Sequence, residues 1–205
     1  MAKRIFDILF SFALLLMSFP LMAIAFIGIR LTSKGPIFYE AARIGKDGAL
    51  LTMYKFRTMH VNDGKGSAIT SPNDARIFKF GAFLRASKID ELPQLYNIIK
   101  GDMSFVGPRP EDPSIVDKYY TKWMHETLAV RPGLTSPGTL YFMKGFSAAV
   151  SDDDAEQSYS DKILAPKLEL DLKYIKTQTF IKDLGIIFET AMTVLIRLLS
   201  FKTKE

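Results

Sequence analysis

The chain has 205 residues and a net charge of +5, from 27 Lys or Arg against 22 Asp or Glu, which suits an anionic partner such as a phosphate-bearing substrate, nucleic acid or an acidic membrane surface. Its length is typical of one domain, and a hydrophobic content of 48% excludes a wholly disordered chain. The sequence has no cysteine and two histidines, which excludes disulfide frameworks, thiolate metal sites and cysteine nucleophiles, and leaves hard cations with oxygen ligands as the metals to consider.

An uncharged apolar segment occupies the start of the chain. Ile8–Ile29 has 22 residues without a charge, long enough at ~1.5 Å per residue to cross a ~30 Å hydrocarbon core. The default interpretation is a membrane-spanning helix. A secretory signal is a second one, because a basic start precedes the segment and Ala23–Ala25 resembles a cleavage site. Against cleavage, the apolar run continues beyond it.

A re-entrant helix, which enters one leaflet and returns, is the third interpretation. Pro20 lies in the middle of the segment, where it removes a backbone hydrogen bond and kinks the helix, and Ser18 lies close enough to bond a freed carbonyl. Basic residues flank both ends, and by the positive-inside rule both flanks then prefer the cytoplasm. These flanking residues are Lys3, Arg4, Arg30, Lys34 and Arg43. From the residues alone, the spanning and re-entrant paths are about equally supported.

A β-hairpin and then mainly helical segments follow. Ile37–Ile44 and Leu50–Arg57 have strand character and flank a turn signal at Gly45–Gly48. Between Lys55 and Arg57 the pattern indicates a basic, solvated strand face. We expect helices at 78–86, 117–128, 163–176 and 182–201, and loops at 60–76, 107–116 and 144–162. The last helix is apolar enough to be either core or interfacial.

The segment 85–102 carries the densest chemical signal. Apolar residues between Leu92 and Ile99 form one helical face, and Gly101 is a stop signal. Because proline is tolerated in a first helical turn, Pro93 predicts a helix that starts near Asp90, with Asp90 as N-cap and Glu91 at the first helical position. Taken alone, this pattern needs no function beyond capping.

The surroundings favour a phosphate-and-metal site. Paired carboxylates can hold Mg²⁺, and an ionised Asp can attack phosphorus, so Asp90 and Glu91 are the candidate catalytic residues and Asp90 the candidate metal ligand. Arg85 precedes them, and Arg109 lies in a stiff Gly-Pro-Arg-Pro segment that limits its freedom. Arg131, in an Arg-Pro-Gly turn, is a third candidate for binding phosphate.

Motifs along nearly the whole chain support a family resemblance. Together they resemble the small monotopic bacterial phosphoglycosyl transferases, also called bacterial sugar transferases. The matching segments are Ser18/Pro20 in the apolar segment, Thr32–Phe38, Arg43–Gly45, Tyr54–Met59, Asp90–Asn97, Lys100–Ser104, Gly107–Pro110 and Arg131–Thr135.

The resemblance implies an activity and a location. A member of this family transfers a sugar-1-phosphate from a UDP-sugar to undecaprenyl phosphate and releases UMP, using Mg²⁺. Carried over, Asp90 is the nucleophile that forms a phosphosugar intermediate, Glu91 is its dyad partner, and Arg85 and Arg109 bind phosphate. The family anchor is a re-entrant helix broken at Ser-Pro, with the catalytic domain on the cytoplasmic face of the bacterial inner membrane.

These observations together predict an α+β chain. It would be a mostly helical compact domain with a small β-hairpin, a re-entrant anchor at residues 1–34, amphipathic interfacial helices and a catalytic domain at 35–205. Expected partners are the UDP-sugar, undecaprenyl phosphate and inner-membrane lipids, with no nucleic acid and with a homodimer as an open alternative. A non-catalytic basic membrane adaptor is the rival interpretation. The sequence departs from the family pattern by Phe19 between Ser18 and Pro20, and by Ser136–Leu140, which lacks the Gly-x-x-Gln of many members.

Overall fold

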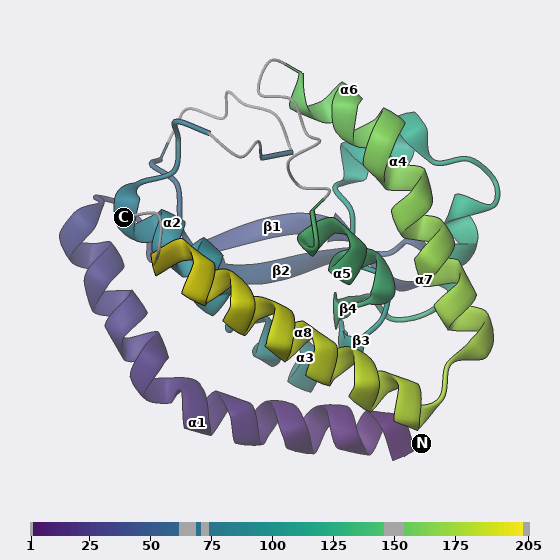
Figure 1. Ribbon diagram of the computed structural model, residues 1–205, viewed down its shortest axis with the longest axis horizontal. Helices are drawn as coiled ribbons and strands as arrows, with labels where there is room; N and C mark the ends of the chain where they lie inside the picture. Colours follow the sequence, from purple (N-terminus) through teal and green to yellow (C-terminus); the bar gives the residue numbers. More distant parts are fainter. Residues whose placement is uncertain (1, 62–68, 71–73, 146–153, 203–205) are drawn as a thin grey trace.

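The computed structural model describes residues 2–61, 69–70, 74–145 and 154–202, which form helices and two small sheets (Figure 1). The longest helices are α1 and α8, at the two ends of the described chain. In chain order the elements are α1 (Ala2–Thr32), β1 (Phe38–Ile44), η1 (Lys46–Gly48), β2 (Leu50–Phe56), α2 (Lys79–Ala86), η2 (Ile89–Glu91), α3 (Gln94–Lys100), β3 (Ser104–Val106), α4 (Pro113–Tyr119), η3 (Met124–Ala129), β4 (Gly133–Thr135), α5 (Pro137–Met143), α6 (Ala155–Tyr159), η5 (Ser160–Leu164), α7 (Ala165–Thr177) and α8 (Phe180–Lys202).

Helix α1 is long and apolar enough to cross a membrane, and most of that stretch is exposed. The helix bends along its length (Figure 1), and Pro20 lies inside it. Since Pro20 has no N–H, the carbonyl of Leu16 loses its usual donor. The Ser18 hydroxyl donates instead to the neighbouring Leu15 carbonyl at 3.4 Å, so the predicted help to the freed carbonyl is not direct.

The first two turns of α1 dock onto the rest of the protein through polar contacts. Arg4 donates to the carbonyls of Ile98 and Ile99, at 2.7 and 3.1 Å, and so caps the C-terminal end of α3. Asp7 is only 2% exposed and accepts hydrogen bonds from the Ser104 hydroxyl at 2.7 Å and from the Phe105 N–H at 3.3 Å. These contacts fix the helix to the segment that joins α3 to β3.

Both α1 and α8 carry rows of exposed apolar side chains. Their beginnings touch, since Lys3 pairs with Asp183 at 2.6 Å and the rings of Phe6 and Phe180 lie edge to face at 5.1 Å. Side chains of this kind that are at least two-fifths exposed include, on α1, Leu9, Phe12, Met17, Phe19 and Ile27, and on α8, Ile181, Phe188, Leu195, Ile196 and Leu199. Apolar surface of this extent marks a contact with membrane or another protein.

The hairpin β1–β2 is antiparallel, and its strand β2 packs against α3. Its register pairs Phe38 with Phe56, and its inner residues Ala41 and Met53 are 1% exposed. Asn97 of α3, fully buried, accepts from the Tyr54 N–H at 3.0 Å and donates to the Thr52 carbonyl at 2.7 Å. One side chain thereby fixes α3 to strand β2.

A short parallel sheet holds the Gly-Pro-Arg-Pro segment. Strands β3 and β4 pair Ser104 with Gly133 and Val106 with Thr135. Beyond the pairing, a Cβ built on Gly133 would lie 2.2 Å from the Gly107 nitrogen, closer than any side chain permits. Gly107 and Gly133 therefore allow their two backbone segments to approach closely. The Gly133 N–H donates a hydrogen bond to the Pro108 carbonyl at 2.9 Å.

Most predicted elements are confirmed. The hairpin is present, as are the helices expected at 78–86, 163–176 and 182–201, and Gly101 ends α3 with a φ of 104°. The helix expected at 117–128 is wrong: α4 ends at Tyr119, and a 3₁₀ helix follows from Met124. Asp112 caps α4 by accepting from Ser114 N–H, with Pro113 at its first position, so the helix begins earlier than expected.

Of the three predicted loops, the one at 107–116 is irregular only as far as Asp112, because α4 begins at Pro113, and the other two are described in part. Residues 62–68 and 71–73 of the loop expected at 60–76, and 146–153 of the one expected at 144–162, lie outside the described residues. From Asp154 onward the loop expectation is wrong. Asp154 caps α6 by accepting from the Gln157 N–H at 3.0 Å, and a π-turn at Ser160–Leu164 continues the helix into α7.

Replacing Asp7 by alanine tests the docking of α1. The substitution leaves the Ser104 hydroxyl and the Phe105 N–H buried without an acceptor, so we expect a loss of about 2–4 kcal/mol in the free energy of unfolding. The control is Glu169→Ala, an exposed carboxylate that should cost less than about 0.5 kcal/mol. Denaturant unfolding in nanodiscs measures both; equal, small losses would contradict the docking role of Asp7.

Candidate active site

The predicted carboxylate pair lies in the tight turn η2 between α2 and α3. Asp90 and Glu91 are both buried, at 6% and 8% exposure. The Glu91 and Leu92 N–H groups bond to carbonyls three residues back, at Lys88 and Ile89. The α-helix begins only at Gln94, since Pro93 cannot donate to the Ile89 carbonyl and the first turn stays 3₁₀.

The predicted capping role of Asp90 is therefore wrong. Lys88, not Asp90, precedes the turn, and neither the start of η2 nor the start of α3 has a side-chain cap. The dyad carboxylates are consequently free of backbone capping bonds. The chemistry that they can perform depends on the side chains around them.

Glu91 is held by three cations. Arg109 binds it with both terminal nitrogens, at 2.6 Å to Oε1 and 3.3 Å to Oε2, and the ammonium groups of Lys88 and Lys55 lie 3.2 and 3.5 Å from Oε1. Burial alone would raise the pKa of Glu91, but Arg109, Lys88 and Lys55 hold it well below its usual range. Glu91 is therefore ionised and fully occupied as an acceptor.

Asp90 lies beside this cluster with less compensation. Its Oδ1 is buried and has no hydrogen-bond partner among the described residues. Burial and the charge of Glu91 raise the pKa of Asp90, against the opposing influence of Lys55, Lys88 and Arg85. A buried carboxylate that lacks a hydrogen bond is costly to ionise, and it is unusually available to a bound group.

Sequence reasoning missed Lys55 and Lys88. Lys55 was expected on a solvated face, but its side chain is 19% exposed and points from β2 toward Glu91. Burial lowers the pKa of Lys55 to about 8. Lys88 has a φ of 60°, a left-handed conformation usually taken by glycine after a helix, and this turn directs its ammonium group to Glu91. Nothing in the sequence pattern identifies that conformation.

Arg57 also differs from the expected solvated face. It is 5% exposed, and its guanidinium donates to the carbonyls of Pro36, Ser33 and Met59 and to the Ser33 hydroxyl, at 2.5–2.9 Å. Arg57 therefore ties the end of α1 to the hairpin. Arg57 directly follows the strand that holds Lys55, so one motif contacts both the end of α1 and the dyad.

The three predicted phosphate-binding arginines are placed differently. Arg109 contacts the dyad directly. Arg85 donates to the Thr58 hydroxyl at 3.3 Å and is near enough to Asp90 to lower its pKa. Arg131 instead donates from Nε to the Gly101 carbonyl at 2.8 Å, beyond the end of α3. The structure therefore gathers Arg85 and Arg109 around the dyad and places Arg131 at the other end of α3.

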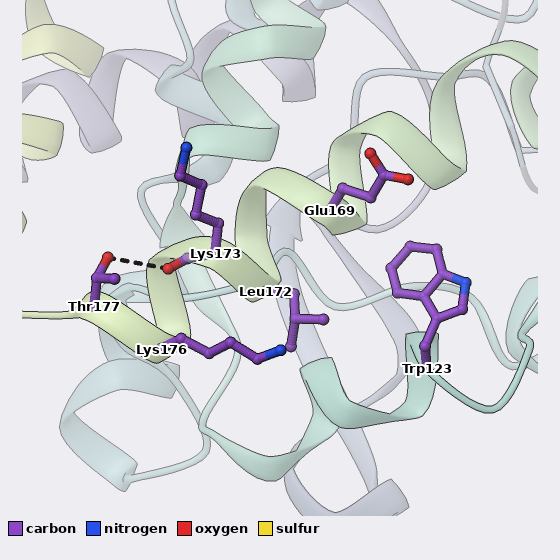
Figure 2. Close-up of a pocket in the computed structure, with 6 residues that line it drawn as sticks. All are labelled: Trp123, Glu169, Leu172, Lys173, Lys176 and Thr177. Carbon is purple, nitrogen blue, oxygen red and sulfur yellow. Dashed lines mark hydrogen bonds between the residues drawn. The ribbon is translucent and has the colours of Figure 1, made fainter.

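A pocket elsewhere in the molecule does not include this chemistry. Figure 2 shows Trp123 facing one side of α7, where Glu169, Leu172, Lys173, Lys176 and Thr177 complete the lining. Neither dyad carboxylate is among them. We place the candidate site at Asp90 and Glu91, because burial and charge converge there and not at this open surface.

The dyad does not form a complete metal cage. In the parts of the chain that the structure describes, no group of three or more His, Asp or Glu side chains is arranged to hold a metal ion. Asp90 provides one available carboxylate oxygen, while Glu91 is engaged by cations. These residues fit a Mg²⁺ ion that binds one protein carboxylate, that of Asp90, and takes its other ligands from substrate phosphates and water.

Comparison with known proteins identifies the family. The chain is 34% identical over 197 residues to a UDP-glucose:undecaprenyl-phosphate glucose-1-phosphate transferase of Caulobacter vibrioides, with 94% of this chain and 69% of the relative covered. An identically named protein of Xanthomonas campestris pv. campestris is 33% identical over 199 residues, covering 95% and 39%. A UDP-N-acetylgalactosamine-undecaprenyl-phosphate N-acetylgalactosaminephosphotransferase of Aeromonas hydrophila is 34% identical over 197 residues, covering 94% and 43%.

The chain thus spans between 39% and 69% of the length of these relatives. A family model described as bacterial sugar transferase matches residues 1–197. This match includes α1, the hairpin, the dyad turn and most of α8. The chain therefore belongs to the bacterial sugar transferase family.

Proposed function

We propose that this protein transfers a sugar-1-phosphate from a UDP-sugar to undecaprenyl phosphate, through a covalent intermediate on Asp90, with release of UMP. The relatives are named as transferases that act on undecaprenyl phosphate, with glucose in two cases and N-acetylgalactosamine in the third. The sugar is therefore not specified by the comparisons, while the phosphoryl chemistry is common to all three names.

The observation that carries the proposal is the unequal treatment of the two carboxylates. Glu91 is neutralised by Arg109, Lys88 and Lys55, whereas Asp90 Oδ1 lacks a hydrogen-bond partner in the described part of the chain. With Arg85 close to Asp90, four cations surround two carboxylates, leaving a positive surplus. A positive, partly desolvated site suits a diphosphate, whose negative charge must be offset before a carboxylate can approach it.

In the first step, an Asp90 carboxylate oxygen attacks the β-phosphorus of the UDP-sugar. A bond forms between that oxygen and phosphorus, the bond from phosphorus to the bridging oxygen breaks, and the bridging oxygen leaves with UMP. The raised pKa of Asp90 indicates a carboxylate that is poorly solvated, and so more nucleophilic once ionised. Arg109 is positioned by Glu91 to receive charge on the phosphoryl oxygens.

In the second step, an oxygen of undecaprenyl phosphate attacks the same phosphorus. The acyl phosphate bond breaks, Asp90 regains its carboxylate, and the product is undecaprenyl-diphosphate-sugar. The cations that bound the donor diphosphate can then bind the acceptor phosphate, so one site serves both steps. Because one site binds both phosphate groups in turn, it needs more positive charge than is required to neutralise Glu91.

Magnesium fits this site through Asp90 and the substrate. The unpartnered Asp90 Oδ1 would be the protein ligand, and the diphosphate and water would complete the shell. When bound, Mg²⁺ supplies neutralisation of the phosphate charge. Because Arg109 binds both carboxylate oxygens of Glu91, Glu91 is not available as a metal ligand. Asp90 is then the single available oxygen donor of the dyad.

The membrane arrangement is part of the same proposal. A lipid phosphate lies at headgroup depth, so an active site that uses it must face the membrane surface. The bend of α1 (Figure 1) and its basic flanks support a re-entrant path with both ends on the cytoplasmic face. The exposed apolar side chains of α8 support an interfacial position for that helix.

Replacing Asp90 by asparagine should abolish transfer and stabilise the fold. UMP release with undecaprenyl phosphate, Mg²⁺ and a panel of UDP-sugars should fall by about 10³-fold or more. Because the pKa of Asp90 is raised, its ionised form costs stability at neutral pH, so we expect Tm in EDTA to rise by about 2 °C. This gain should shrink as pH falls through that pKa.

The control for this substitution is Asp47→Asn, at a side chain that is 73% exposed. It should change neither activity nor Tm. Substantial turnover by Asp90→Asn would exclude Asp90 as the nucleophile. A lower Tm would contradict the expectation that the ionised Asp90 carboxylate destabilises the fold.

Lys55 should set an alkaline limit on activity. Since its pKa is about 8, raising the pH through that value removes a positive charge beside Glu91, and kcat/KM for the UDP-sugar should fall. The variant Lys55→Arg keeps its charge and should extend the plateau upward by about one pH unit or more. A wild-type profile that is flat from pH 7 to 10, or identical profiles for both proteins, would refute this role.

Cysteine labelling tests the path of α1. The chain has no native cysteine, so Ala2→Cys and Lys34→Cys mark the two ends of the helix at exposed positions. A membrane-impermeant maleimide should label both only from the cytoplasmic side in oriented vesicles, as it does Lys122→Cys in the catalytic domain. Labelling of the two ends from opposite sides would establish a spanning helix instead.

A further inference from the structure

A second group of buried charged and polar side chains includes Glu111, two residues after Arg109, and the mechanism above uses none of its members. Glu111, Lys167 and Tyr159 are each less than a tenth exposed. The Tyr159 hydroxyl donates to Glu111 Oε1 at 2.6 Å, and the Lys167 ammonium group donates to the same oxygen and, at 2.6 Å, to the Tyr159 hydroxyl. The group joins the segment after Arg109 to α6 and α7.

Glu111 is also a neighbour of Arg109. It follows Arg109 by two residues, with the rigid Pro110 between them, and its carbonyl accepts from the Ile44 N–H at 2.9 Å. Burial lowers the pKa of Arg109, but Glu91 and Glu111 both act to raise it, and it is raised overall. Arg109 therefore lies in the field of two carboxylates, of which it binds Glu91.

A buried carboxylate without a cation is costly and would attract the nearest one. Arg109 and Arg43 both interact electrostatically with Glu111. Arg43 is already paired with Asp112 at 2.5 Å, so the competitor is Arg109, unless another cation holds Glu111. Lys167 provides that cation from α7, and it is 3% exposed, so water cannot substitute for it. The ion pair thus satisfies Glu111 and leaves the guanidinium of Arg109 directed to Glu91.

We propose that Lys167 is a positioning residue for the transferase site: by holding Glu111, it prevents Glu111 from capturing Arg109 and so keeps Arg109 on Glu91. Tyr159 assists by donating to the same carboxylate oxygen. Helix α7 thereby acts on the dyad through Glu111, although it touches neither Asp90 nor Glu91 in any contact that the structure describes.

The two partners of the ion pair should differ when removed. Lys167→Met leaves Glu111 without a cation and free to compete for Arg109. Glu111→Gln leaves no competitor, and Lys167 retains an acceptor one helical turn away in Asp171, whose buried Oδ2 has no hydrogen-bond partner among the residues that the structure describes. A merely structural ion pair predicts similar effects from both substitutions, because each breaks the same bond.

The first test observes Arg109 directly and does not depend on activity. The side-chain Nε–Hε resonance of Arg109 is recorded by NMR in ¹⁵N-arginine-labelled full-length protein in nanodiscs, and is assigned with Arg109→Lys. We expect it to shift in Lys167→Met, and to keep its wild-type position in Glu111→Gln and in the double variant Glu111→Gln/Lys167→Met. The control Lys173→Met removes an exposed lysine of α7 and should leave the resonance in place.

The second test measures transfer and rests on the proposed function. Lys167→Met should lower Asp90-dependent UMP release by about tenfold or more, whereas Glu111→Gln and the double variant should stay within about threefold of wild type. An activity recovered by removing the second charge cannot come from a scaffold that the first substitution had damaged. Lys173→Met should match the wild-type protein.

Distinct outcomes overturn the two proposals. Equal losses in Lys167→Met and Glu111→Gln, or an Arg109 resonance that moves in both, would overturn the positioning role of Lys167. If Lys167→Met does not fold, a shifted Arg109 resonance in Glu111→Gln or in the double variant would overturn it, and unshifted resonances in both would support it. Absence of transfer by the wild-type protein would refute the proposed function, while the NMR comparison would still decide the role of Lys167.

Discussion

The buried contact between Glu91 and its three cations is the interaction on which the site depends. Lys55 comes from β2, Lys88 from the turn after α2, and Arg109 from the segment that follows β3, so three separate parts of the fold meet at one carboxylate. Each part must be in register for the charges to balance. Because these cations bind Glu91, the neighbouring Asp90 keeps a carboxylate oxygen that has no hydrogen-bond partner among the described residues. That oxygen is available to react.

The fold connects this cluster to the apolar helix α1 through side-chain contacts that involve α3. Asn97 fixes α3 to β2, and Arg4 of α1 caps the opposite end of the same helix. The bent helix α1 is consequently one body with the helix that follows the dyad (Figure 1). The proposed function, which joins a soluble nucleotide sugar to a membrane lipid, requires an active site at a fixed height above the bilayer, and direct docking of α1 to α3 would supply it.

Much of the fold and part of the site could be predicted from the sequence. Periodicity and turn residues identified the hairpin, the long helices and the Gly101 stop, because these depend on local preferences. The dyad and Arg109 were found from their residue types and their Gly/Pro frame. The capping role assigned to Asp90 was wrong, since Pro93 delays the α-helix. Lys55, Lys88 and Lys167 were missed, because a lysine on a strand, in a left-handed turn or on an amphipathic helix is usually solvated, and only tertiary packing places the first two against Glu91 and buries Lys167.

The central claim, that Asp90 carries the sugar phosphate between donor and acceptor, is tested most directly by mass spectrometry of the protein itself. Full-length protein is mixed with Mg²⁺ and its preferred UDP-sugar in the absence of undecaprenyl phosphate, then quenched in acid and mapped by peptide. The account predicts an added mass equal to one sugar phosphate on the peptide that contains Asp90, lost when undecaprenyl phosphate is supplied. An enzyme that turns over with lipid, yet shows no adduct on that peptide at any time before the lipid is added, would contradict it.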